Sequence, residues 1–268
     1  MIDLFYNKII FKYSKIVICL MLLLTTFFFL EAINLKIDAS SDTLILEKDK
    51  DLKYFQLLNK RYKSPEFLII AFKPKQFLLS EESKKNIRDI TTDLEQLKPV
   101  SNVTSILNVP LLLSSKKSLA DILEGVPSIE DNVVENKFIM KEFTNSPLYK
   151  NNLVSEDFKT TAILINLKEN NTLLKLREKK QKYQNILDER NFTDSELISF
   201  NTVKKDIIEE RHKLRVIQNE LILNVRNIIY QYRQFGEIYL GGIPMIANDV
   251  VSFVKKDLKV FGIAILFF

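Results

Sequence analysis

Hydrophobic positions are spread unevenly along this chain of 268 residues. One uncharged run, IVICLMLLLTTFFFL, covers residues 16–30, and another, VFGIAILFF, covers residues 260–268. Between them, apolar and charged residues alternate as in a globular domain. If it is extended through Glu31 to Leu35, the first run reaches the ~20 residues that cross ~30 Å of hydrocarbon at 1.5 Å per residue. The pattern therefore predicts a transmembrane helix over 16–35.

The flanks of these two runs suggest how they are used. Lys8, Lys12 and Lys15 precede the first run, so residues 1–15 are expected in the cytoplasm and the next domain in the periplasm. A cleaved signal peptide is the alternative, but Ile37 stands where cleavage near Ala39 would need a small residue. Residues 260–268 cover about 13 Å, under half of a bilayer. We read them as a truncated second transmembrane helix, and the sequence as a fragment.

The region 36–243 is predicted to be a periplasmic α+β domain. Short apolar runs at 67–72, 103–107, 160–167 and 237–240 are typical of strands. Ser80 is placed to cap a helix that reaches residue 97. A further helix is expected before the first strand, from apolar residues at spacings of three and four. These residues are Leu52, Phe55, Leu58 and Tyr62.

A charged helical region fills residues 171–234. Thr193 and Glu196 have the spacing of a capping box, which predicts a break near Asn191 and a helical hairpin. The second arm is expected to pack on the sheet through one apolar side, formed by Val216, Leu221, Val225, Ile228 and Tyr232. The order strand, helix, strand, strand, helix, strand predicts a ferredoxin-like (split βαβ) sandwich with this hairpin inserted. The long connection 108–159 is expected to be a semi-ordered excursion with short helical pieces.

A glycine pair marks the end of the last predicted strand. Gly241 and Gly242 permit a sharp turn, and Pro244 suits the first turn of a helix. From Met245 a helical pattern runs without a breaker into the apolar tail, so we predict an amphipathic connecting helix over 244–259. Such turns are common, and a structural role is the simplest interpretation of this one.

Charge and composition exclude several classes of protein. The formal net charge is +5, but lysines and acids are interspersed and no basic stripe marks a nucleic-acid site. Cys19 is the only cysteine, so an internal disulfide is excluded, and His212 is the only histidine, in a charged helical context. No phosphate-binding loop or nucleophile elbow is present. We therefore expect no enzyme activity, no cofactor and no metal.

Several separated stretches resemble, in order, the first part of an exporter of the RND superfamily, MMPL type. They are IDASSDTL at 37–44, FLIIAF at 67–72, NVPLL at 108–112, NSPLY at 145–149, LGGIPMIAND at 240–249 and KDL at 256–258. The resemblance implies a proton-driven permease of the bacterial inner membrane, multi-pass, whose first porter domain would lie here, in the periplasm. It makes Gly241, Gly242, Pro244, Asp249 and Asp257 the candidates for coupling.

The function expected from this resemblance is efflux of lipid-like or amphiphilic substrates. The expected partners are the lipid bilayer, the remaining membrane helices of the full-length protein and a hydrophobic or amphiphilic substrate, while an oligomer stays unassigned. The family's proton-relay acids lie in later helices, so none is assigned here. The alternative is a membrane-anchored periplasmic sensor or scaffold, in which the same domain binds a partner and nothing is transported.

Overall fold

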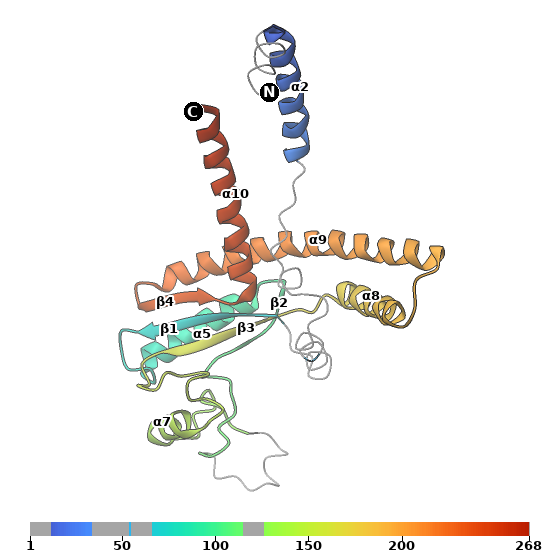
Figure 1. The fold of residues 1–268 in the computed structure, drawn as a ribbon. Coiled ribbons are helices and arrows are strands. Elements are labelled where there is room, and N and C mark those ends of the chain that lie inside the picture. Colours follow the sequence, from blue (N-terminus) through green and yellow to red (C-terminus); the bar gives the residue numbers. More distant parts are fainter. Residues whose placement is uncertain (1–11, 34–53, 55–65, 115–125, 268) are drawn as a thin grey trace. The chain divides into compact units, whose positions relative to one another are not determined.

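The computed structural model describes residues 12–33, 54, 66–114 and 126–267. The chain divides into two compact units, Met1–Leu46 and Glu47–Phe268. Figure 1 labels the elements of both. In chain order they are α2 (Ser14–Ile33), β1 (Phe67–Pro74), α5 (Glu81–Glu95), β2 (Val100–Thr104), α7 (Asn136–Asn145), β3 (Thr161–Leu167), α8 (Asn171–Glu189), α9 (Asp194–Tyr232), β4 (Gly236–Gly241) and α10 (Ile243–Phe267).

The described part of the first unit is helix α2, which has 20 residues. The sequence predicted a membrane crossing here by counting past Glu31 to Leu35, but the helix ends at Ile33. Its uncharged run, 16–30, rises only about 22 Å at 1.5 Å per residue, short of ~30 Å of hydrocarbon. No helix in the described part of the chain combines the length and the apolar character that crossing a bilayer requires.

The fold class as predicted, which began with a membrane-spanning helix, is therefore wrong. The same finding removes the start of a second spanning helix that was expected at 260–268. Helix α10 does run unbroken into that stretch, as predicted, but four charged residues occupy the turns just before it. They are Lys255, Lys256, Asp257 and Lys259.

The second unit is built on one sheet with the strand order β2-β3-β1-β4, in which every neighbouring pair is antiparallel. The two central strands align Ile70 with Ile163, and β4 aligns Leu240 with Ile70 from the other side. Helix α5 connects β1 to β2, which are parallel and lie on either side of β3. Helices α8 and α9 connect β3 to β4, which lie on either side of β1. This is the split βαβ order.

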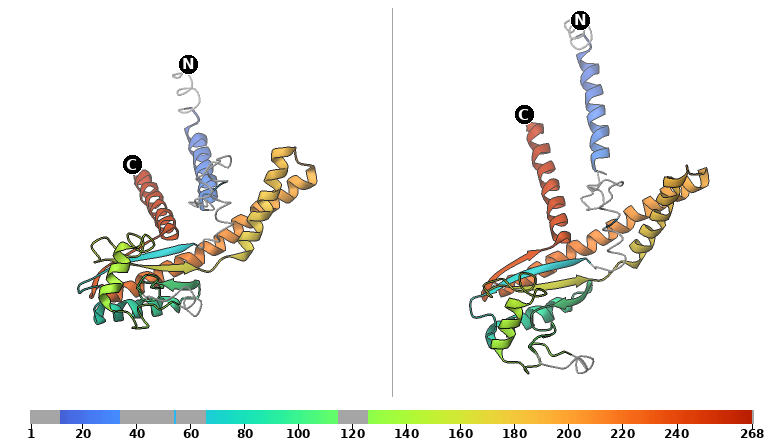
Figure 2. Two further views of the ribbon diagram at one scale, coloured as in Figure 1. Left: turned by 90° about the horizontal axis from the view of Figure 1, so that it is seen from below. Right: turned by 60° about the horizontal axis from the view of Figure 1, so that its bottom comes forward.

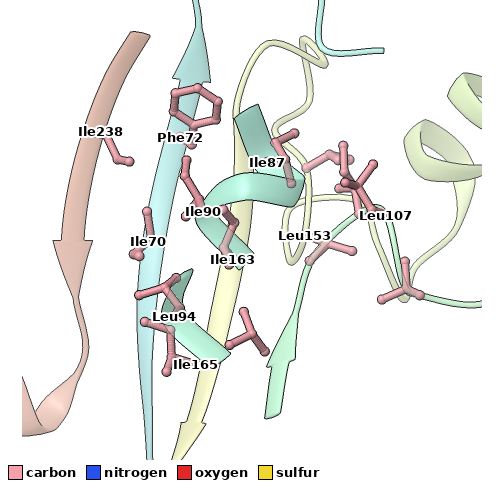
Figure 3. Close-up of a cluster of buried hydrophobic side chains, with 14 of the residues drawn as sticks. Ile70, Phe72, Ile87, Ile90, Leu94, Leu107, Leu153, Ile163, Ile165 and Ile238 are labelled. Atoms are coloured by element: carbon pink, nitrogen blue, oxygen red, sulfur yellow. The ribbon is translucent and has the colours of Figure 1, made fainter. Parts of the chain in front are cut away.

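The core lies between one face of this sheet and two helices, α5 and the second half of α9. Alternate residues of β1 point into it, because successive side chains of a strand face opposite sides: Leu68, Ile70 and Phe72 are fully buried. Figure 3 shows the isoleucines and leucine of α5 above the strands. They are Ile87, Ile90 and Leu94, each with no exposed surface.

Helices α8 and α9 form the predicted hairpin, and Figure 2 shows it extending beyond the sheet. Leu173, Val203 and Ile207 make a small second core between its arms. The capping box is present: Thr193 Oγ1 accepts from the Glu196 N–H at 3.4 Å, and the Glu196 carboxylate accepts from the Thr193 N–H at 2.8 Å. Arg190 donates to both oxygens of Glu196, at 2.9 and 2.7 Å.

These contacts predict how the hairpin tip responds to acid. Hydrogen bonds from Arg190 and then Thr193 lower the pKa of Glu196 from 4.5 to about 2. Because the folded pKa lies below the unfolded one, the stabilisation is complete above about pH 4.5 and is lost as pH falls through about 2. The protection of the amides at residues 193–197 against exchange, relative to their intrinsic rates, should therefore fall across that window.

The variant Glu196→Gln should lose this acid-dependent step in amide exchange. The exposed Glu220→Gln, on the same helix and with the same change of charge, should keep it. An unchanged step in Glu196→Gln would show that another group controls the tip.

Most predicted boundaries lie within a few residues of those observed, and two expectations are corrected. Strand β2 is Val100–Thr104 rather than 103–107, because the buried Ile106 and Leu107 belong to the turn that follows it. Val216, expected on the packing side of α9, is 57% exposed. Five residues separate it from Leu221, which at 3.6 residues per turn places the two on different sides of the helix.

The long connection 108–159 is packed in its described parts, unlike the semi-ordered excursion expected. Phe143 of α7 is fully buried, and the Tyr149 hydroxyl donates to the Pro110 carbonyl. The buried Glu142 carboxylate accepts from the backbone N–H groups of Leu113 and Ser114, at 3.0 and 2.9 Å. Apart from Tyr54, the helix predicted around Leu52–Tyr62 lies outside the described residues, and so does the stretch 37–44.

Candidate functional site

The predicted coupling residues meet where the sheet joins α10. Strand β4 ends at Gly241 and α10 begins at Ile243, so one residue makes the turn. That residue, Gly242, has a φ of 121°, a backbone conformation that residues with a side chain rarely adopt. Its carbonyl accepts the first helical bond, from the Ile246 N–H at 3.0 Å. Pro244 is buried in the first turn, where its missing N–H costs no hydrogen bond.

Close contact with β1 holds this turn in place. A Cβ on Gly242 would lie 2.9 Å from the Phe67 carbonyl oxygen and 3.1 Å from the Leu68 Cα. A Cβ on Gly241 would meet only the Ile69 carbonyl oxygen, at 3.9 Å. The turn therefore requires glycine at one of the two positions.

An ion pair fixes the next turn of α10 to α9. One guanidinium nitrogen of Arg226, Nη2, lies 2.9 Å from Oδ1 and 2.8 Å from Oδ2 of Asp249. The two side chains are 41% and 26% exposed, so solvent weakens their attraction and the pair contributes about 0.5–1 kcal/mol. Val251, two residues further along α10, is buried. Helix α10 is thus attached to the sheet and to α9 at once.

Helix α9 is in turn attached to α5. The Tyr232 hydroxyl donates to Asp93 Oδ2 at 2.7 Å. Burial, and next the bond to the Asp93 carboxylate, raise the pKa of Tyr232, so this phenol stays a donor over the whole physiological range. The Arg226–Asp249 and Tyr232–Asp93 contacts connect α10, α9 and α5 in series.

Four of the five predicted candidates belong to this junction: Gly241, Gly242, Pro244 and Asp249. Asp257 does not, because it lies two helical turns beyond Asp249 and is exposed. Sequence reasoning missed Arg226, since its partner is 23 residues away and only the packing of α9 on α10 brings them together. It also missed Gly236, whose Cβ would lie 2.3 Å from the Lys73 carbonyl oxygen.

A shallow pocket of about 130 Å³ lies at the base of the hairpin. Leu167, Leu173 and Leu221 line it together with the charged Glu66 and Lys168. Ligand sites usually measure roughly 300–1,000 Å³, so this pocket could take the end of an acyl chain but not a whole lipid. It is not a substrate cavity by itself.

The junction has the chemistry of a mechanical contact. Its groups are glycines, a proline and one ion pair, and none of them is placed as a nucleophile with a neighbouring base. Among the described residues no group of three histidine, cysteine or acidic side chains could hold a metal ion. The geometry joins α10 to the sheet through Gly242 and to α9 through the Arg226–Asp249 pair.

Comparison of the chain with protein-family models, with curated proteins and with solved structures finds no match.

Proposed function

We propose that this chain contributes a porter-like module to a proton-driven exporter of the RND superfamily, MMPL type, which moves lipid-like or amphiphilic substrates out of a bacterial cell. The observation that carries the proposal is the direct junction between β4 and α10, with Gly242 as its turn. A helix joined to a sheet without a linker cannot tilt unless the sheet tilts too. In the proposal, movement of α10 changes the porter domain and so drives the substrate forward.

Two further observations support this proposal. The strands have the split βαβ order that the sequence predicted for this domain. The sequence stretch with the most specific resemblance, 240–249, contains the turn, the buried proline and the ion-paired Asp249, which are the residues that join α10 to the rest of the unit.

The Arg226–Asp249 pair offers the cleanest test, because it can be reversed without touching the strained turn. The complete gene is expressed in a bacterium that lacks its own RND-type exporters, and efflux of N-phenyl-1-naphthylamine is measured with and without a protonophore. Arg226→Asp or Asp249→Arg alone places like charges together and should slow efflux by up to about fivefold. The double exchange should restore it.

Asp206→Asn serves as the matched control, since Asp206 is an exposed acid on α9 outside the junction. Equal efflux in all variants at equal expression would remove the coupling role. Absence of protonophore-sensitive efflux for this dye and for a panel of bile salts and fatty acids would remove export.

In that case the partner-binding alternative stands, which a different observation favours. The hairpin tip exposes Leu187 by 47%, Leu197 by 48% and Ile198 by 68%, beside the rigid Arg190–Glu196 contact. Exposed apolar side chains on a fixed scaffold are typical of surfaces that meet another protein.

A further inference from the structure

Helix α10 exposes a continuous apolar face beyond the junction. Its apolar side chains recur at spacings of three and four residues, and their exposed fractions run from 37% to 76%. Figure 1 shows the helix leaving the sheet at β4. The residues of this apolar face are Ile246, Val250, Phe253, Val254, Leu258, Phe261 and Ile265.

The opposite side of the same turns is basic. Lys255, Lys256 and Lys259 are exposed and lie within five positions of one another, and Asp257 is the only acid of α10 after Asp249. An amphipathic helix with lysines on its polar side is attracted to anionic lipid headgroups as well as to the apolar layer beneath them.

We propose that α10 docks on an anionic lipid surface, with its apolar face in the acyl boundary and its lysines at the phosphate level. The last turns favour lipid over a protein groove. Val260, Phe261, Ile263 and Ile265 are all exposed, and at 3.6 residues per turn they spread over more than half of the helix circumference. A groove on a second copy would cover one side of them, whereas lipid can cover all sides.

One residue makes this proposal specific. Asp257 lies within the apolar face, four residues from both Phe253 and Phe261, so docking removes its carboxylate from water. Burying a charge without a partner is far more costly than burying an amide. Asp257→Asn should therefore tighten docking, by roughly three- to tenfold.

The test needs a readout at α10 itself, because α2 also exposes apolar side chains. The full chain with Cys19→Ser contains no cysteine, and Gly262→Cys then carries a nitrobenzoxadiazole label. A Cβ at position 262 meets no atom within 4 Å, so the substitution should not disturb the fold. Quenching by nitroxide-labelled phosphatidylcholine reports whether the label is in lipid. A label at Ser195→Cys, on the hairpin tip, is the matched control.

On vesicles of phosphatidylcholine and phosphatidylglycerol in equal amounts, the label at 262 should be quenched and the label at 195 should not. Replacing each of the three lysines by glutamine should weaken docking about fivefold per residue, and high salt should do the same. Asp257→Asn should strengthen it, while Asp206→Asn, an equal change of charge on α9, should leave it unchanged.

Three results would overturn the proposal: no quenching at 262, equal quenching on vesicles of pure phosphatidylcholine, or a label that becomes shielded without vesicles as protein concentration rises. The last result would mean that a second copy covers the face. The proposal identifies α10 as the element that meets lipid and gives the roles of its lysines and Asp257, and it does not depend on the proposed function. Normal vesicle docking with no efflux would remove export alone, and normal efflux with no docking would remove this inference alone.

Discussion

Alanine at position 242 is expected to lower the free energy of unfolding by about 3 kcal/mol, whereas alanine at 241 should change it by less than about 0.5 kcal/mol. Gly242 has a φ of 121°, where an L side chain is strained, and its Cβ would lie 2.9 Å from the Phe67 carbonyl oxygen. The backbone of a paired strand cannot retreat from that contact without breaking the sheet. A Cβ on Gly241 has an ordinary contact at 3.9 Å.

Urea unfolding of the full chain, followed by circular dichroism, measures both free energies. The neighbouring glycines serve as controls for each other, because the two variants add the same methyl group one residue apart. Equal midpoints for Gly241→Ala and Gly242→Ala would mean that the turn relaxes in solution. The connection between β4 and α10 would then not be rigid, and it could not support the proposed coupling.

The glycine pair also illustrates what could be learned from sequence. Two glycines after a strand indicated a turn, and Pro244 placed the start of the helix, because both signals are local. Which glycine is indispensable depends on how close β1 approaches, and no local pattern carries that information. The same holds for Gly236, which packs against Lys73 and Pro74.

Periodicity and capping residues predicted the elements of the sandwich and the hairpin well. Ser80 caps α5, and Thr193 with Glu196 forms a capping box, because these contacts join residues only three apart. The core side of β1 was not predicted, because its apolar run FLIIAF has no polar position to mark the other face. Strand β2 was misplaced because Ile106 and Leu107 extend the apolar run into a buried turn. A buried turn and a buried strand have the same hydrophobic pattern.

Only part of the junction could be predicted from the sequence. Asp249 was singled out through a resemblance, but its partner Arg226 required the crossing of α9 and α10. The prediction at the N-terminus failed for another reason, since it counted past Glu31 to Leu35 to reach the ~20 residues of a crossing, whereas helix α2 ends at Ile33. Hydropathy measures how apolar a stretch is, but it does not show at which residue the helix ends, and the length of the helix decides whether it can cross a membrane.

Replacing Phe72 by alanine should cost about 3–5 kcal/mol of stability, the range for truncating a fully buried phenylalanine. Phe72 lies on the central strand β1 with no exposed surface, and neither α5 nor β4 can easily collapse into the space it would leave. Phe67 lies on the same strand but faces the other side of the sheet and is 39% exposed. Phe67→Ala should therefore cost less than about 1 kcal/mol.

The difference between these two phenylalanines tests which face of the sheet is the core. Thermal and urea unfolding should give Phe72→Ala a much lower free energy of unfolding than Phe67→Ala. This is expected when one face of the sheet is covered by helices and the other is partly open. Comparable losses would mean that the second face is also covered in solution. The sheet would then be closed on both sides, and a change in α10 could no longer move it freely, which would count against coupling through this junction.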